Sequence, residues 1–167
     1  MEGDFTRFPI EKYNVSKFLG QGGFGNVLSY TILQKEDSLP DVVAVKIFQQ
    51  KHASNLHKEK DIMEALAVNR HPNIVKYFGM CQLPRGQEAL VYEVFDIDLM
   101  EFMMKKNTSI HNGESRNILH QIAKALQHMR NVKTVHRDVK PENVLLKFAE
   151  TDRIKVCQLK TTYQYLQ

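Results

Sequence analysis

Residues 136–143, His-Arg-Asp-Val-Lys-Pro-Glu-Asn, combine side chains that can transfer a phosphoryl group. The carboxylate of Asp138 can accept or orient a hydroxyl proton, and the carboxamide of Asn143 can ligate Mg²⁺ through its carbonyl oxygen. Lys140 can neutralise charge on the group that is transferred. A polar loop capped by Pro141 and without chemistry is the alternative, but this combination of residues rarely arises by chance. The segment therefore predicts phosphoryl-transfer chemistry.

A glycine cluster near the N-terminus has the spacing Gly-x-Gly-x-x-Gly, formed by Gly20, Gly22 and Gly25. Glycine allows a turn to approach phosphate oxygens closely and adopts positive φ at low cost. The same spacing marks dinucleotide-binding turns, but those lead into a helix. Here residues 26–31 continue as a β-prone run, which disfavours that interpretation. A glycine-rich hairpin without a ligand is the remaining alternative.

Lys46 closes a β-prone run of small and branched residues, where a long flexible cation can reach phosphates under the glycine turn. Two carboxylates of the next predicted helix, Glu59 and Glu64, compete as its partner. The apolar stripe of that helix consists of Ile62, Met63 and Leu66. Glu59 lies three, four and seven positions before these residues, and hence beside the stripe, whereas Glu64 points elsewhere. We favour Glu59 and keep Glu64 as the alternative.

The elements that must position these residues change in type along the chain. We expect strands at 13–19, 25–33, 41–48, 74–79 and 89–94, one helix at 55–68, and a turn at 84–86. Beyond Phe95 we expect helices at 99–105 and 115–129, with short strands at 135–138, 144–146 and 154–156. The resulting division is an N-terminal lobe of residues 1–93, a hinge at 94–98, and a partial C-terminal lobe of residues 99–167.

The predicted helix at 115–129 would be capped by Ser115 or Asn112. It carries an apolar face made of Ile118, Leu119, Ile122, Ala125, Leu126 and Met129. No later helix is predicted to cover this face. We therefore expect an exposed stripe, with instability, aggregation or an obligate partner as its consequence.

The composition is that of an ordinary globular chain, with 43% hydrophobic and 25% charged residues among 167. The net charge of +4 is scattered and never forms a basic run, which argues against a nucleic-acid partner. Cys81 and Cys157 have no metal-ligand spacing, so a zinc site is not expected. Without a long apolar stretch or a signal peptide, we expect a cytoplasmic protein with no membrane partner.

Taken in order, the motifs closely resemble those of the eukaryotic protein kinases. They are the glycine turn, Val43-Ala44-Val45-Lys46, the helix glutamate, His71-Pro72-Asn73-Ile74-Val75 and the segment 136–143. Lys140 followed by Pro-Glu-Asn is similar to the Ser/Thr branch. The resemblance implies an α+β, protein-kinase-like fold: an N-terminal antiparallel sheet with one helix, then the start of a mainly helical C-terminal lobe. It also implies ATP as cofactor, and a protein substrate or partner kinase.

The resemblance implies a role for individual residues by position. Asp138 and Lys140 would be catalytic, Asn143 would bind metal, and Lys46 paired with Glu59 would hold the α- and β-phosphates. Gly20, Gly22 and Gly25 would cover the phosphates. The adenine would be lined by Val27, Ala44 and Leu145, by Tyr92 as gatekeeper, and by the hinge residues Glu93 to Phe95. The regulatory stack would consist of Met63, Tyr77, His136 and Leu159.

The chain departs from the family pattern after the strand at 154–156. Where the family has a metal-binding Asp-Phe-Gly, this sequence reads Gln158-Leu159-Lys160. A neutral Gln158 cannot supply the carboxylate that holds Mg²⁺, so the Mg²⁺ site is in doubt. Two functions therefore compete. One is a Ser/Thr kinase that transfers the γ-phosphoryl group of ATP in its complete form, and the other is a pseudokinase-like or truncated regulatory module.

Overall fold

The computed structural model of the chain describes residues 7–106, 110, 112–148, 154–159 and 164–165. The chain forms two compact units. The first comprises residues 1–64 and 76–94, and the second comprises residues 65–75 and 95–167. No helix of the described ranges is both long and apolar enough to span a lipid bilayer.

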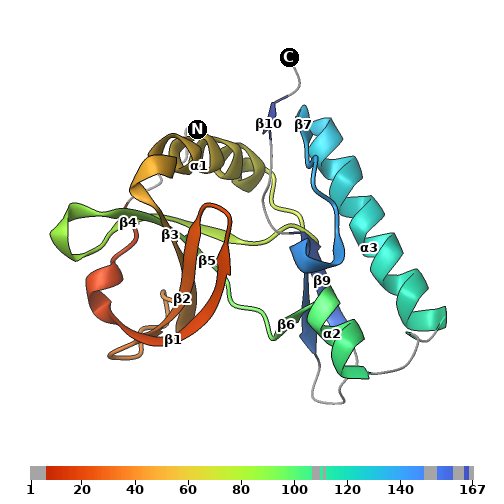
Figure 1. Cartoon of the computed structure of the whole chain (residues 1–167), viewed down its shortest axis with the longest axis horizontal. Coiled ribbons are helices and arrows are strands. Elements are labelled where there is room, and N and C mark those ends of the chain that lie inside the picture. The colour runs from red at the N-terminus through yellow and green to blue at the C-terminus, as the bar shows by residue number, and fades with distance from the viewer. Residues whose placement is uncertain (1–6, 107–109, 111, 149–153, 160–163, 166–167) are drawn as a thin grey trace. The chain divides into compact units, whose positions relative to one another are not determined.

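The first unit is an antiparallel sheet with one helix, as the sequence predicts (Figure 1). Its strands, in the spatial order β1-β2-β3-β5-β4, are β1 (Tyr13–Gly22), β2 (Gly25–Ile32), β3 (Val42–Phe48), β5 (Glu88–Tyr92) and β4 (Tyr77–Gln82). The helix is α1 (Ala53–Val68), and short 3₁₀ turns lie at Ile10–Lys12, Gln50–His52 and Pro84–Gly86.

Strand β4 starts three residues later than predicted and does not end at Gly79. Ile74 and Val75 are buried, and they group with the second unit, so their β-branched side chains serve packing there. Gly79 has a φ of 131° and lies where the β4–β5 register shifts. A bulge at this glycine lets the strand continue to Gln82, so the glycine is not the end signal that it resembles.

Side-chain alternation gives the sheet of the first unit two different faces. One face carries the apolar core, which consists of Phe8, Ile10, Tyr13, Val43, Val45, Cys81, Leu83, Ala89 and Val91. Burial raises the pKa of the Cys81 thiol to about 12, so this cysteine stays protonated and acts as a small apolar side chain. The other face carries Ala44 and Lys46 of β3. The predicted stripe of α1, namely Ile62, Met63 and Leu66, is buried, and so is Leu56.

Among its described residues, the second unit contains one short helix, one long helix and several short strands. They are β6 (Ile97–Asp98), α2 (Leu99–Lys106), α3 (Asn112–Asn131), β7 (Thr134–Val135), β8 (Val144–Phe148), β9 (Ile154–Leu159) and β10 (Gln164–Tyr165), with a 3₁₀ turn at Pro141–Asn143. The order β6-β8-β9 forms one small sheet, and β7 pairs with β10. The predicted strand at 135–138 ends at Val135, because β10 pairs only with Thr134 and Val135 and the chain then turns.

Helix α3 differs from its prediction at its start and on its apolar face. It begins at Asn112, so Ser115 lies inside the first turn, where its hydroxyl donates to the carbonyl of Ile110 at 3.5 Å. Leu119 is 65% exposed, because one residue beyond the buried Ile118 is a rotation of about 100°.

The apolar face of α3 is covered more than the sequence predicts, although Ile122 and Leu126 are half-buried rather than buried. Ile118, Ala125 and Met129 are all buried, with exposed fractions of 3%, 0% and 1%. The helix packs against β9 and β7, two short strands that follow it in the chain. Part of the predicted apolar face therefore lies against strands of the same unit.

The segment 71–75 is attached to α3 by polar contacts within the second unit. Asn73 is buried and its Nδ2 donates to Oε1 of Gln121 at 2.7 Å. The backbone N–H of Asn73 donates to Nδ1 of His71 at 3.1 Å, and the His71 ring stacks on the ring of His128 at 4.9 Å. Burial, followed by the charges of His128 and Lys124, lowers the pKa of His71 below 6.5.

We predict that His71 makes the stability of the chain depend on pH. Below pH 6.5 the unfolded chain binds a proton that folded His71 resists, so the free energy of unfolding decreases as pH falls from 7.5 to 5.5. His71→Asn keeps an acceptor for the Asn73 N–H but does not titrate, and should reduce the drop in melting midpoint over this range. His120→Asn, on the exposed surface of α3, is the control. Equal pH slopes for the wild type and His71→Asn would contradict the prediction.

Candidate nucleotide and catalytic sites

The predicted site residues fall into two groups, one in each unit. The glycine turn, Lys46, Glu59 and Tyr92 belong to the first unit, and the segment 136–143 belongs to the second. Each group forms contacts of its own.

The ammonium of Lys46 forms an ion pair with the carboxylate of Glu59. The distance from Nζ to Oε2 is 2.5 Å, and the two side chains are 20% and 12% exposed. Lys46 also lies over the ring of Phe48, two residues on along the same face of β3, at 4.9 Å. The competing carboxylate, Glu64, pairs instead with Lys60 of its own helix at 3.2 Å. Of the two candidates, helical geometry places Glu59 against the sheet and Glu64 beside a surface lysine.

Glu59 has a second partner that the sequence reasoning missed. The hydroxyl of Tyr92 donates to Oε1 of Glu59 at 2.6 Å, so each carboxylate oxygen accepts a hydrogen bond from a different strand. Tyr92 lies directly opposite Ala44 in the β3–β5 register, and both side chains therefore project from the face that carries Lys46. A single sequence offers no signal for this contact, because the register of β5 is not readable from it.

The glycine turn is a tight hairpin between β1 and β2, in which Gly22 pairs with Gly25. Neither these two glycines nor Gly20 and Gly23 adopt positive φ, so the conformational reason for glycine is wrong here. A Cβ atom at Gly20, Gly22 or Gly23 would meet no atom within 4 Å. A Cβ at Gly25 would overlap the carbonyl oxygen of Ile47 and lie 2.9 Å from its carbonyl carbon. Close packing against β3 therefore explains Gly25.

We predict that Gly25→Ala destabilises the first unit, because the new methyl group must displace the backbone of β3. Overpacking of this kind costs about 1–3 kcal/mol of unfolding free energy. Gly23→Ala is the matched control: its methyl group enters open space, and its effect should stay within about 0.5 kcal/mol. Chemical unfolding of both variants checks the difference. Equal unfolding free energies for Gly25→Ala and Gly23→Ala would contradict the prediction, because they would mean that β3 moves aside without loss of stability.

Val27 and Ala44, two further residues predicted near the nucleotide, share the face of Lys46. Val27 lies directly opposite Lys46, and Ser29 lies directly opposite Ala44, in the β2–β3 register. Opposite residues of an antiparallel pair project to the same side. Val27, Ala44, Lys46 and Tyr92 thus form one surface, continuous with the strand ends that carry the glycine turn.

In the second unit, Asp138 lies at the centre of a small polar cluster. Its Oδ2 is 3.0 Å from Nζ of Lys140 and accepts a hydrogen bond from Nδ2 of Asn143 at 2.9 Å. The same Nδ2 donates to the Asp138 carbonyl at 2.8 Å. The hydrogen bond from Lys140, aided by that from Asn143, lowers the pKa of Asp138, and the pKa of Lys140 is raised. Asp138 is therefore ionised at neutral pH.

The local backbone brings these three residues together. Arg137 has a φ of 65°, a strained value for a residue with a side chain, and it reverses the chain beside the buried His136. The N–H of Asp138 donates to Nδ1 of His136 at 3.3 Å. After Lys140, the 3₁₀ turn that starts at Pro141 returns Asn143 to Asp138, and the N–H of Asn143 donates to the Lys140 carbonyl at 2.9 Å.

The donor set for a divalent cation is small. The described residues contain no cluster of three or more His, Cys, Asp or Glu side chains that could hold a metal ion. Because Nδ2 of Asn143 donates to Asp138, its Oδ1 is the atom that can ligate a cation. Position 158, where the family pattern has its aspartate, lies opposite Leu145 in the β8–β9 register and is a glutamine.

The remaining predicted residues divide between the units. Glu93 is held at the end of β5, where its N–H donates to the Lys76 carbonyl at 3.0 Å and its Oε1 accepts from the Lys76 N–H at 2.7 Å. In the second unit, Lys147 lies over the ring of Phe95 at 5.6 Å, and Leu145 pairs with Asp98 of β6. Of the predicted stack, Met63 and Tyr77 belong to the first unit and His136 to the second, whereas the side chain of Leu159 lies outside the described residues.

Comparison with known proteins identifies the family of this chain. The family described as protein kinase domain matches residues 13–163, which is nearly the whole chain. The chain therefore belongs to the protein kinase family, and the domain is that of a kinase-like enzyme. The resemblance found in the sequence motifs is confirmed, and so is the α+β kinase-like fold.

Relatives are spread over plants, fungi and animals. The chain is 30% identical over 154 residues to cysteine-rich receptor-like protein kinase 6 of Oryza sativa subsp. japonica, over 89% of this chain and 21% of that protein. It is 30% identical over 141 residues to the carbon catabolite-derepressing protein kinase of Candida glabrata, over 82% of this chain and 22% of that protein. It is also 30% identical over 153 residues to serine/threonine-protein kinase 36 of Pongo abelii, over 89% of this chain and 11% of that protein. The chain thus spans about a fifth or less of these relatives.

Proposed function

We propose that this chain supplies the ATP-binding and phosphoryl-transfer residues of a Ser/Thr protein kinase that acts on protein hydroxyl groups. The Lys46–Glu59 ion pair carries the proposal, because a lysine fixed by a helix carboxylate beside a glycine turn is suited to hold phosphates. The whole protein would be longer than this chain, as its relatives are. A protein substrate with Ser or Thr hydroxyl groups, and a cytoplasmic location, are part of the proposal.

In the first unit, the proposed ligand is the nucleotide. The turn around Gly20 and Gly22 has space on its surface that phosphate oxygens could enter, and Lys46 would contact the α- and β-phosphates. Val27 and Ala44 share the Lys46 face and would pack on the adenine. The N–H of Glu93 is already bonded to Lys76, so Glu93 would meet the adenine edge through its carbonyl.

In the second unit, the proposed role of Asp138 is to accept or orient the proton of the substrate hydroxyl. Its lowered pKa keeps the carboxylate ionised, and the Asn143 amide fixes its orientation. Lys140, 3.0 Å from the same oxygen, would move between the carboxylate and the charge of the transferring group. The nucleotide itself supplies the phosphoryl group.

Mg²⁺ does not fit the described residues well. Asn143 can offer one neutral oxygen, and Asp138 is the carboxylate beside it, but position 158 adds no carboxylate to the set. The neutral residue at position 158 is the observation behind a second candidate, a pseudokinase-like module that would hold nucleotide and act by contacting a partner kinase.

We predict that ATP raises the melting midpoint of purified residues 1–167, and that Lys46→Met reduces the increase. Ligand bound only by the folded state stabilises it by mass action, and loss of the phosphate-binding cation weakens binding. Lys76→Met is a matched control, because Lys76 also lies on a ring two residues further on, at 4.8 Å from Phe78. Its ATP shift should equal that of the wild type.

The result with added Mg²⁺ separates the two candidates. A shift that grows with Mg²⁺ supports the kinase, and a shift that does not depend on Mg²⁺ supports the nucleotide-holding module. An equal ATP shift in Lys46→Met and wild type, with and without Mg²⁺, would remove Lys46 from the nucleotide site. No shift in the wild type would remove the ATP site of this chain.

We predict that Asp138→Asn abolishes any phosphoryl transfer to a Ser/Thr peptide, since the amide cannot accept the hydroxyl proton. The expected decrease in kcat is at least about 100-fold, the lower range for a general base. Asp37→Asn, an exposed aspartate of the first unit, serves as control and should keep the wild-type rate. Transfer that survives in Asp138→Asn would remove the base assignment.

A further inference from the structure

The carboxylate of Glu59 is held from two sides by two strands of one sheet. Lys46 of β3 contacts Oε2 at 2.5 Å, and the hydroxyl of Tyr92 of β5 donates to Oε1 at 2.6 Å. Hydrogen bonds to an ionised acceptor are short and strong, and two of them fix the plane of the carboxylate. We propose that Tyr92 is a positioning residue, whose hydroxyl orients Glu59 so that this carboxylate pairs with Lys46.

The position of the Tyr92 hydroxyl is determined by the sheet. Tyr92 is buried, lies opposite Ala44 on one side and opposite Tyr77 on the other, and packs against the Tyr77 ring at 5.6 Å. A tyrosine has only two side-chain torsions, and burial restricts both. The donor is therefore restricted, while the acceptor Glu59 has three side-chain torsions and lies on a different element, α1.

Tyr92 consequently gives α1 an attachment to β5 that is independent of Lys46. When the Lys46 ammonium turns toward another anion, Oε1 of Glu59 still has its hydroxyl donor and the helix keeps its place. For catalysis the inference rests on the proposed function, because the pair matters there only if Lys46 holds phosphates. The contact itself can be tested without nucleotide.

We test the inference by the reactivity of the Lys46 amine in the nucleotide-free chain. Residues 1–167 are labelled briefly with a low concentration of acetic anhydride, and mass spectrometry gives the acetylation rate of Lys46. Tyr92→Phe keeps the ring but loses the hydroxyl, and should raise this rate about threefold to tenfold, the effect of losing about one hydrogen bond. Glu59→Gln should raise it as well, and Tyr92→Phe should add nothing in the Glu59→Gln background.

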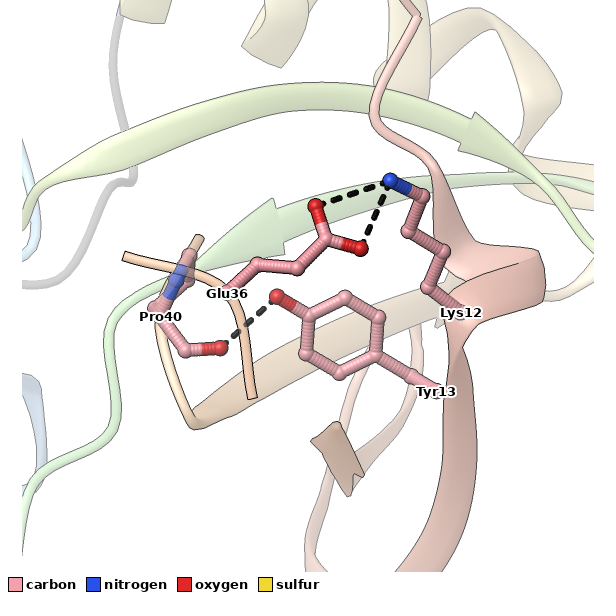
Figure 2. Close-up of polar contacts among 4 residues, drawn as sticks. All are labelled: Lys12, Tyr13, Glu36 and Pro40. Carbon is pink, nitrogen blue, oxygen red and sulfur yellow. Dashed lines mark hydrogen bonds and ion pairs between the residues drawn. The ribbon is translucent and has the colours of Figure 1, made fainter. Parts of the chain in front are cut away.

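Tyr13 offers a matched control in the same unit. Its hydroxyl donates to the Pro40 carbonyl at 2.7 Å, beside the Lys12–Glu36 ion pair at 2.9 Å, as Figure 2 shows. Tyr13→Phe loses a comparable hydrogen bond, and should leave the Lys46 rate unchanged. The acetylation rate of Lys12 is the internal reference for Tyr92→Phe. A general loosening of the unit would raise the Lys12 and Lys46 rates together.

Two results would overturn the inference. One is an unchanged Lys46 rate in Tyr92→Phe, and the other is an equal increase with and without the Glu59 carboxylate, which would mean that the hydroxyl acts elsewhere. If Tyr92→Phe melts too low for labelling, Glu59→Asp replaces it. The shorter carboxylate cannot span both donors, so the Lys46 rate should rise, and an unchanged rate would overturn the inference.

The labelling and the ATP-dependent melting separate this inference from the proposed function. A wild-type chain that shows no ATP shift contradicts the nucleotide site, but the labelling rates still decide whether Tyr92 positions Glu59. If ATP does shift the wild type, Tyr92→Phe should show a smaller shift, and Tyr13→Phe should show the wild-type shift. A full shift in Tyr92→Phe would contradict the positioning role in nucleotide binding.

Discussion

The ion pair between Lys46 and Glu59 is the interaction on which the first unit is arranged. Both groups are mostly removed from water, so each charge needs the other, and loss of either leaves a partly desolvated ion. The pair also joins β3 to α1. These two elements follow one another in the chain, but local propensity alone does not bring them into contact. The helix stripe buries its apolar residues beside this contact, and hydrophobic burial and charge pairing thus specify the same rotation of α1.

The second unit also contains a cluster of charged and polar side chains, but this cluster is smaller and lies around Asp138. Asp138, Lys140 and Asn143 lie within a single loop, and the turn at Pro141 with the strained Arg137 backbone brings them together. Strain at Arg137 must be offset by the surrounding structure, and the burial of His136 next to it supplies a fixed point. The geometry of this loop is therefore local, whereas the geometry around Lys46 depends on the register of a whole sheet.

This difference explains how far the sequence could predict the site. The helix face of Glu59 follows from a period of 3.6 residues, and the cluster around Asp138 follows from residues that are neighbours in the chain. The bond from Tyr92 to Glu59 depends on how β5 pairs with β3, and no local pattern encodes that register. The packing of α3 shows the same limit, because the sequence indicates short strands at 135–138 and 154–156 but not the helix against which they pack.

Gly25 has a further consequence for how this turn should be interpreted. Three of its glycines have open space above them, while the fourth is in contact with the carbonyl of Ile47, one residue beyond Lys46. A residue can thus be obligatorily glycine in a phosphate-binding pattern because of a neighbouring strand, with no ligand involved. In a substitution survey of this turn, intolerance at position 25 would measure the fit of two strands, and only positions 20, 22 and 23 would report on what the turn binds.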